Sequence, residues 1–285
     1  SNLGYYYDVL ANIIFTNNYI DIVEYLIHYS INNDLIVLWN IFFYHACKHN
    51  NFNIIKLIDS YIIIGDYFSK NGLVIACEKK YYNIIKFIFD KCIYEFIDET
   101  LLLDLVSIAI KYGHIEIFKI FSPHITNFYN LIPELCHYGR HKFIKHILDN
   151  YELDIHKNSE ELFREVCNYN MISLANYMLK KYNNIDTTTY GCQIFRNACQ
   201  KGNVDIVQLV INDINFKKHN SQIYTGFLKA CKENRFEILK IIKTKFPELD
   251  IYYKSGLFID TATDIRIINW LRNDCKTFTH KSARK

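Results

Sequence analysis

The sequence contains little proline or glycine and lacks apolar runs long enough to cross a bilayer. Only 3 prolines and 9 glycines occur among 285 residues, and none of the glycines forms a glycine-rich phosphate-binding loop. The apolar run at residues 35–44 is interrupted by Asn40, and it is far shorter than the ~20 residues of a membrane-spanning helix. We therefore expect no membrane span and no nucleotide cofactor.

Catalytic and metal-binding motifs are also missing. Neither His-Glu-x-x-His nor Cys-x-x-Cys occurs, and the nearest to a metal site is His45 with His49, one turn apart on a predicted helix. A zinc site needs three or four ligands, and Cys47 between the two histidines occupies a core position. The net charge of +3 is too small to indicate a nucleic-acid binder. We expect no enzyme activity, no metal, no cofactor and no small-molecule substrate.

A motif that recurs about every 30 residues is the most informative feature present. Its clearest copy, residues 198–207, reads Ala-Cys-Gln-Lys-Gly-Asn-Val-Asp-Ile-Val, and intervals between copies range from 26 to 33 residues. Each copy is aligned on one residue, the anchor, near the end of an apolar stretch. The anchors are Ile14, Ala46, Ala76, Ala109, Leu135, Val166, Ala198, Ala230 and Ile259. A period of this length is typical of solenoid proteins, which bury their core between neighbouring units.

Each copy carries a helix-stop residue four positions after its anchor. The nine stop residues are Asn18, Asn50, Lys80, Gly113, Gly139, Asn170, Gly202, Asn234 and Thr263. Seven of them are Gly or Asn, which end helices in the left-handed conformation. A second apolar segment follows each stop. These segments predict second helices at residues 20–29, 52–59, 82–90, 115–121, 141–149, 172–181, 204–211, 236–244 and 265–272. The unit is helix, tight turn, helix, with minimal β-structure.

The pattern Ala-Cys-x-x-Gly-Asn-Val-Asp-Ile-Val-x-Leu-Val-Ile resembles the second half of an ankyrin repeat, and matches extend from about Ile14 to Leu271. The family's Thr-Pro-Leu-His opening is missing throughout. The resemblance implies an all-α, right-handed solenoid of about nine stacked two-helix ankyrin-like repeats with irregular connecting loops. It would form a single domain over residues 1–285, with an N-terminal cap at 1–13 and a basic tail at 273–285. This degenerate form is similar to ankyrin proteins of amoeba-infecting giant viruses.

Six of the nine cysteines occupy one position, directly after an anchor: Cys47, Cys77, Cys136, Cys167, Cys199 and Cys231. Stacked helices lie roughly 8–10 Å apart, whereas disulfides need Cα atoms within about 7 Å. We expect these six side chains to be buried, unbridged and free of metal. Unpaired cysteines indicate a reducing, intracellular location, which would be the host cytoplasm or the virion of a viral protein.

Candidate partner-binding residues are the two that follow the anchor and its neighbour in the seven copies from Ala46 to Ala230. The ankyrin resemblance turns these positions toward a concave groove: Lys48, His49, Glu78, Lys79, Lys111, Tyr112, His137, Tyr138, Asn168, Tyr169, Gln200, Lys201, Lys232 and Glu233. Three consecutive copies place a tyrosine second, and tyrosine is enriched at binding hot spots. The alternative is that these rings pack on neighbouring loops and cover the solenoid.

Lysine recurs at one position of the second helices: Lys56, Lys86, Lys119, Lys145 and Lys240. Such a row could contact phosphate or an acidic membrane surface, but it is more typical of a solvated outer face.

These features favour a non-catalytic protein–protein interaction scaffold or adaptor that binds a partner protein through the groove. One alternative is a structural or assembly component of a viral particle. The other is a nucleic-acid binder or an enzyme within a repeat array.

Overall fold

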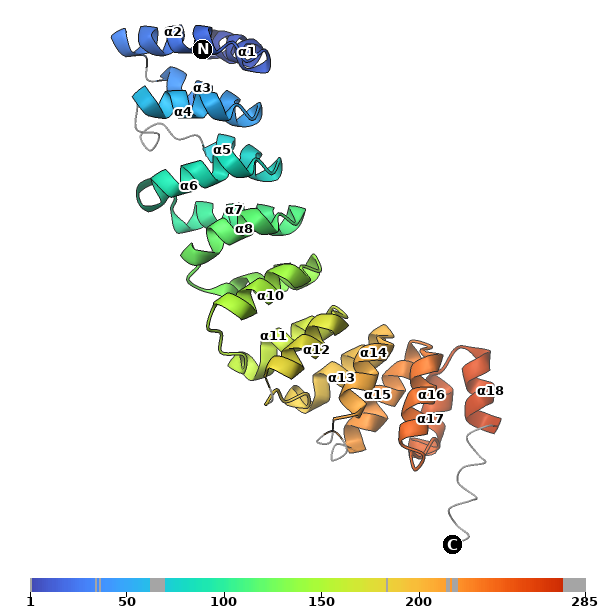
Figure 1. Ribbon diagram of the computed structural model, residues 1–285. Coiled ribbons are helices and arrows are strands. Elements are labelled where there is room, and N and C mark those ends of the chain that lie inside the picture. Colours follow the sequence, from blue (N-terminus) through green and yellow to red (C-terminus); the bar gives the residue numbers. More distant parts are fainter. Residues whose placement is uncertain are drawn as a thin grey trace. The chain divides into compact units, whose positions relative to one another are not determined.

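The computed structural model describes residues 2–33, 35, 37–61, 70–182, 184–213, 216 and 220–273. Within these ranges the chain contains 18 α-helices, the 3-10 helices η2 (Ser122–His124) and η3 (Phe128–Leu131), and no strand (Figure 1). The predicted all-α class is therefore confirmed.

The α-helices of the described ranges follow one another along the chain as nine successive pairs, each with a first and a second helix. The first members, here the odd-numbered helices, are α1 (Asn2–Thr16), α3 (Val37–Lys48), α5 (Lys70–Glu78), α7 (Glu99–Tyr112), α9 (Ile132–His137), α11 (Lys157–Asn168), α13 (Thr189–Lys201), α15 (Asn220–Lys232) and α17 (Tyr253–Thr261). The even-numbered helices are α2 (Ile20–Asn32), α4 (Phe52–Tyr61), α6 (Tyr82–Phe96), α8 (Ile115–Phe121), α10 (His141–Asn150), α12 (Ile172–Lys181), α14 (Val204–Ile211), α16 (Phe236–Lys245) and α18 (Ile265–Asn273). All nine even-numbered helices begin at the predicted residue, although α2 and α6 run several residues further.

The chain divides into two compact units, Ser1–Ile147 and Leu148–Lys285. In the first unit, the odd-numbered helices contact one another in sequence from α1 to α9. The even-numbered helices do the same from α2 to α8. In the second, α11, α13, α15 and α17 contact in sequence, and α14 contacts α16. Figure 1 shows neighbouring pairs lying side by side within each unit. These contacts are consistent with a helical array; the ankyrin-type solenoid and the single domain stay predictions.

The turns inside the pairs share one backbone geometry. Eight of the nine predicted stop residues have φ between +54° and +90°: Asn18, Asn50, Lys80, Gly113, Gly139, Asn170, Gly202 and Asn234. At each of these turns, the N–H of the residue after the stop donates to the anchor carbonyl, over 2.8–3.1 Å. This bond closes the helix end in the manner of a Schellman motif. The predicted stops are thus left-handed helix ends at eight positions.

Thr263 does not adopt the left-handed conformation expected of a stop residue. Helix α17 ends at Thr261, and its cap residue Ala262 is extended (φ −75°, ψ 136°). The side chain of Asn234 supplies the missing acceptor, because its Oδ1 receives the backbone N–H groups of Thr263 and Asp264. A side chain from the preceding pair therefore replaces the left-handed turn here.

Three connecting loops of the second unit contain an aspartate turn. In each, the aspartate side chain accepts a hydrogen bond from the backbone N–H two residues later: Asp154 from His156, Asp186 from Thr188 and Asp250 from Tyr252. Such turns satisfy backbone donors locally without strand pairing. They give the connecting loops an irregular, strand-free form within the described residues.

The apolar positions of the pattern form the core. Eight anchors are buried, from Ile14 to Ala230, whereas Ile259 is partly exposed. The six cysteines that follow an anchor are also buried, and no disulfide joins them. Both outcomes confirm the sequence-based expectation for the described cysteines. Among the helices that the structure describes, none is both long and apolar enough to span a membrane.

Arginine side chains extend the capping of helix ends from one pair to the next. The Arg140 Nε donates to the carbonyl of Ile110 over 2.5 Å, and its Nη2 donates to that of Lys111. Likewise, Arg235 Nε donates to the carbonyl of Gln200 over 3.1 Å. A Cβ on Gly113 would lie 2.8 Å from Arg140 Nη1. Two requirements therefore favour glycine at this stop: the left-handed backbone, which Asn and Lys also adopt at other stops, and room for the end of the Arg140 side chain.

Two glycine substitutions separate these requirements. Gly139→Ala should lower the free energy of unfolding by about 1 kcal/mol, because a Cβ is unfavourable at positive φ and nothing else lies within 4 Å of it. Gly113→Ala should lower it by about 2 kcal/mol, because it also displaces Arg140 from the carbonyls it caps. Urea unfolding of both variants measures the difference. Equal losses would show that Arg140 gives way without cost.

Candidate functional site

The predicted groove residues all lie at the ends of odd-numbered helices. The first member of each pair is in the last turn, and the second is either the last helical residue or the one after it. Eight of the fourteen residues, Lys48 to Tyr138, belong to the first unit, and six, Asn168 to Glu233, belong to the second. Most are exposed; His49, Glu78, Asn168 and Glu233 are partly buried. All fourteen residues therefore lie at helix ends, as expected, and their role in partner binding stays a prediction.

In the first unit, Tyr112 and Tyr138 each lie beside a cation. The rings are 47% and 38% exposed, respectively. The Lys111 Nζ lies 5.5 Å from the centroid of the Tyr112 ring, and the Arg140 guanidinium lies 5.7 Å from that of Tyr138. These separations allow cation–π attraction, which orders the rings without burying them. Both tyrosines are therefore available for binding, although each also packs against its neighbours.

Histidine rings complete these two tyrosine sites. The His114 ring is nearly parallel to Tyr112 at 5.9 Å between centroids, and the His137 ring meets Tyr138 edge-on at 5.0 Å. The His114 Nε2 also hydrogen-bonds the carbonyl of Glu78 over 3.1 Å, which ties the site to the preceding pair. The result is an aromatic surface bordered by hydrogen-bond donors.

His45 and His49 take part in contacts with α1. His45 is buried, and its Nε2 lies 2.8 Å from Asp8 Oδ1, while His49 Nε2 lies 3.0 Å from Asn12 Oδ1. The pKa of His49 is lowered by burial and then by the neighbouring charges of His45 and Lys48. Within the described residues, no three His, Cys, Asp or Glu side chains gather in a metal-binding arrangement. The two histidines therefore join helices.

In the second unit, Tyr169 also lies beside a cation. Its ring is 42% exposed, and the Lys201 Nζ lies 5.7 Å from its centroid. The same ammonium group donates to the carbonyl of Asn168 over 2.8 Å. Asn197 Nδ2 donates to Asn168 Oδ1 over 2.9 Å, and Lys229 Nζ donates to Gln200 Oε1 over the same distance. A hydrogen-bonded network therefore connects the ends of α11, α13 and α15.

An open depression lies on this network. It has a volume of about 360 Å³ and is lined by Asn197, Gln200, Lys201, Glu233 and Arg235. Three of these residues belong to the predicted set, whereas Asn197 and Arg235 do not. The lining contains two cationic side chains, two amides and one carboxylate. It is suited to a partner's carboxylate or carbonyl groups.

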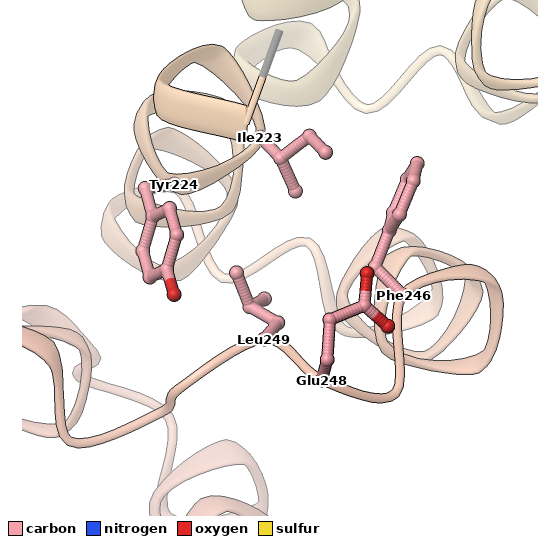
Figure 2. Close-up of a pocket in the computed structure, with 5 residues that line it drawn as sticks. All are labelled: Ile223, Tyr224, Phe246, Glu248 and Leu249. Atoms are coloured by element: carbon pink, nitrogen blue, oxygen red, sulfur yellow. The ribbon is translucent and has the colours of Figure 1, made fainter. Parts of the chain in front are cut away.

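A second hollow, shown in Figure 2, is a packing feature. Ile223 and Tyr224 on α15 face Phe246, Glu248 and Leu249 of the segment after α16. Its volume of about 70 Å³ is well below the several hundred Å³ of ordinary ligand sites. The Tyr224 hydroxyl accepts the backbone N–H of Asp250 over 3.3 Å. We therefore do not propose this hollow as a ligand site.

Four of the five lysines in the row on the even-numbered helices contact side chains of their own helix. Lys86 Nζ pairs with Asp90 over 3.0 Å, and Lys119 Nζ pairs with Glu116 over 2.9 Å. Lys56 and Lys240 lie over the Phe52 and Phe236 rings of their own helices, at 4.5 and 4.2 Å. These contacts fit a solvated outer face and give no support to a phosphate site.

The chain matches no known protein-family model, and no curated protein is significantly similar to it in sequence. The resemblance to ankyrin repeats therefore rests on the motif and its spacing.

The buried cysteines should react slowly. Burial raises the pKa of Cys77 to about 12 and that of Cys192 to about 11, and it also raises the pKa values of Cys47 and Cys199. Because the thiolate is the reactive form, labelling with a maleimide should be slow in the native protein and fast after unfolding. Mass spectrometry of peptides from time-resolved labelling measures this for each site. Fast native labelling at Cys77 or Cys199 would contradict the assignment of these residues to the core.

Proposed function

We propose that the protein is a non-catalytic scaffold or adaptor that binds a partner protein through the ends of its odd-numbered helices. In this proposal the helix pairs form a right-handed, ankyrin-like solenoid, and the helix ends line its concave groove. The recurring left-handed turns and the contacts between successive helices support the solenoid. The disulfide-free, buried cysteines support a reducing intracellular location, either cytoplasm or virion.

The observation that carries this proposal is the pairing of exposed tyrosines with cations. Tyr112, Tyr138 and Tyr169 occupy equivalent positions, and each lies within 6 Å of a Lys or Arg charge. A tyrosine offers large contact area and a polar tip, and the cation beside it selects acidic or carbonyl groups. The partner that fits is a protein segment carrying carboxylates next to apolar side chains.

A structural or assembly component of a viral particle is the second candidate. One separate feature favours it: nine of the exposed large hydrophobic side chains among the described residues lie on α1, on α2 or in the turn between them. In that case the main contacts would be made by these two helices and not by the three tyrosines.

Substitution of Tyr138 tests the groove. Affinity purification with crosslinking from the native source identifies the principal partner, and calorimetry then measures its affinity. Tyr138→Ala should weaken binding by about 2 kcal/mol, or roughly thirtyfold, because a hot-spot ring is lost. The thermal midpoint should change by only a few degrees, because the ring is exposed. Tyr138→Phe should retain most of the affinity if ring area dominates.

Tyr82 on α6 offers a matched control, because its ring is similarly exposed but lies at the start of an even-numbered helix. Tyr82→Ala should leave the affinity unchanged. If Tyr138→Ala binds as tightly as the wild type, or if both alanine variants weaken binding equally, the groove is not the binding surface.

A further inference from the structure

The depression of the second unit retains hydrogen-bond donors that its own side chains do not use. It lies between the last turns of α13 and the turn that joins α15 to α16, and α13 and α15 contact each other. Its volume is about 360 Å³. We call it the α13–α15 depression, and its lining residues are Asn197, Gln200, Lys201, Glu233 and Arg235.

Arg235 is fixed at one edge of the α13–α15 depression. Its Nε donates to the carbonyl of Gln200 over 3.1 Å, and its side chain crosses Gly202, where a Cβ would lie 3.1 Å from the arginine Cδ. A guanidinium has five N–H donors, and within the described residues this is the only side-chain hydrogen bond that Arg235 makes. Its two Nη groups therefore remain for an acceptor, on an exposed side chain.

Lys201 and Gln200 add donors on the α13 side. Lys201 Nζ spends one of its three N–H groups on the carbonyl of Asn168, over 2.8 Å. Because an ammonium group only donates, the 2.9 Å bond from Lys229 Nζ turns the amide oxygen of Gln200 toward Lys229. The NH₂ group of Gln200 is then left as a donor, so Arg235, Lys201 and Gln200 all offer donors in one depression.

Glu233 limits the charge that the α13–α15 depression accepts. It is the one carboxylate in the lining, against two cations, so the net charge of the lining is +1. Among the described residues, no ion pair joins Glu233 to Lys201 or Arg235. A single carboxylate would neutralise the lining, whereas a phosphate dianion would be repelled by Glu233 with twice the charge. The chemistry that fits is one carboxylate.

Tyr169 places an aromatic ring near the same cation. Its ring is 42% exposed, and the Lys201 Nζ lies 5.7 Å from the ring centroid. The ring offers contact area to an apolar side chain. In an extended segment, side chains two residues apart lie on the same side, roughly 7 Å from each other. The fitting segment therefore carries an apolar residue about two residues from its acidic residue.

We propose that the α13–α15 depression binds one carboxylate of an extended segment of the partner protein, through the Arg235 guanidinium and the Lys201 ammonium. This inference rests on the proposed function, and it names the group that the partner must supply. The paired Nη donors of Arg235 match the two oxygens of a carboxylate, and Glu233 disfavours groups of higher charge.

Peptides displayed on phage are the probe. A random library is selected on the full chain, and the selected peptides should be enriched in Asp or Glu at one position, about two residues from an apolar residue. One such peptide is then synthesised with a fluorescent label and an amidated C-terminus. Fluorescence polarisation measures its affinity for the wild type and for variants of the full chain.

Two substitutions in the depression should change the affinity in opposite directions. Arg235→Gln should weaken the peptide about tenfold, because the charged fork is lost while the amide can still donate to the Gln200 carbonyl. Glu233→Gln should tighten binding about threefold, because a repulsive charge is removed. A folding defect cannot produce that gain. Lys240→Gln is the charge-matched control on the exposed face of α16 and should leave the affinity unchanged.

Peptide variants test the pairing itself. With its acidic residue replaced by the amide, the peptide should bind the wild type about tenfold more weakly, and Arg235→Gln should then have little further effect. The same amide peptide with a free C-terminus distinguishes the source of the carboxylate. Affinity that returns with the free C-terminus, and is lost again in Arg235→Gln, would assign the site to a chain end; no return would assign it to an acidic side chain.

The outcomes separate this proposal from the proposed function. A selection without acidic enrichment, or without any binder, would overturn the carboxylate site. So would a peptide that Tyr169→Ala weakens but that Arg235→Gln and Glu233→Gln leave unchanged, and that result would keep the proposed function intact. The converse result, in which Arg235→Gln weakens the peptide and Tyr169→Ala does not, would support the carboxylate site and count against the tyrosine surface.

Discussion

The structure depends on the way each odd-numbered helix ends. A helix leaves its last carbonyl groups without partners inside the helix, and here a left-handed residue reverses the chain so that the next N–H reaches back to the anchor carbonyl. The same bond occurs at eight turns, with N···O distances of 2.8–3.1 Å. Because it fixes both the end of one helix and the start of the next, it determines the hairpin shape of every pair it closes.

The helix ends also join the pairs to one another. Arg140 and Arg235 donate to carbonyls of the preceding odd-numbered helix, and Arg140 and Lys201 also lie beside Tyr138 and Tyr169. A cation that caps a helix and contacts an exposed ring links stability to the proposed binding surface. Substitution of Arg140 or Lys201 would therefore disturb both, whereas an exposed tyrosine can be removed with little effect on the fold. This difference explains why the tyrosines are the better probes of function.

Features that depend on a single residue and its near neighbours could be predicted from the sequence. Gly and Asn tolerate positive φ, so seven of the left-handed stops could be read from single positions, and all nine even-numbered helices begin at the residue expected from the repeat. The buried cysteines followed from their fixed distance to the stops. Asn234, which caps the turn at Thr263, and Arg140, which crosses Gly113, could not be read in this way. Their partners lie about 30 residues away, and spacing alone does not say which side chain reaches across. The same limit applies to Asn197 and Arg235 in the depression of the second unit.

In the proposed function, the ends of the odd-numbered helices form the partner-binding surface. Hydrogen–deuterium exchange of the full chain, with and without its captured partner, tests this most directly. We expect protection on binding to concentrate in the last turns of the odd-numbered helices, around Tyr112, Tyr138 and Tyr169, while the even-numbered helices change little. Protection confined to the lysine row of the even-numbered helices, or no change at the tyrosine turns, would contradict it.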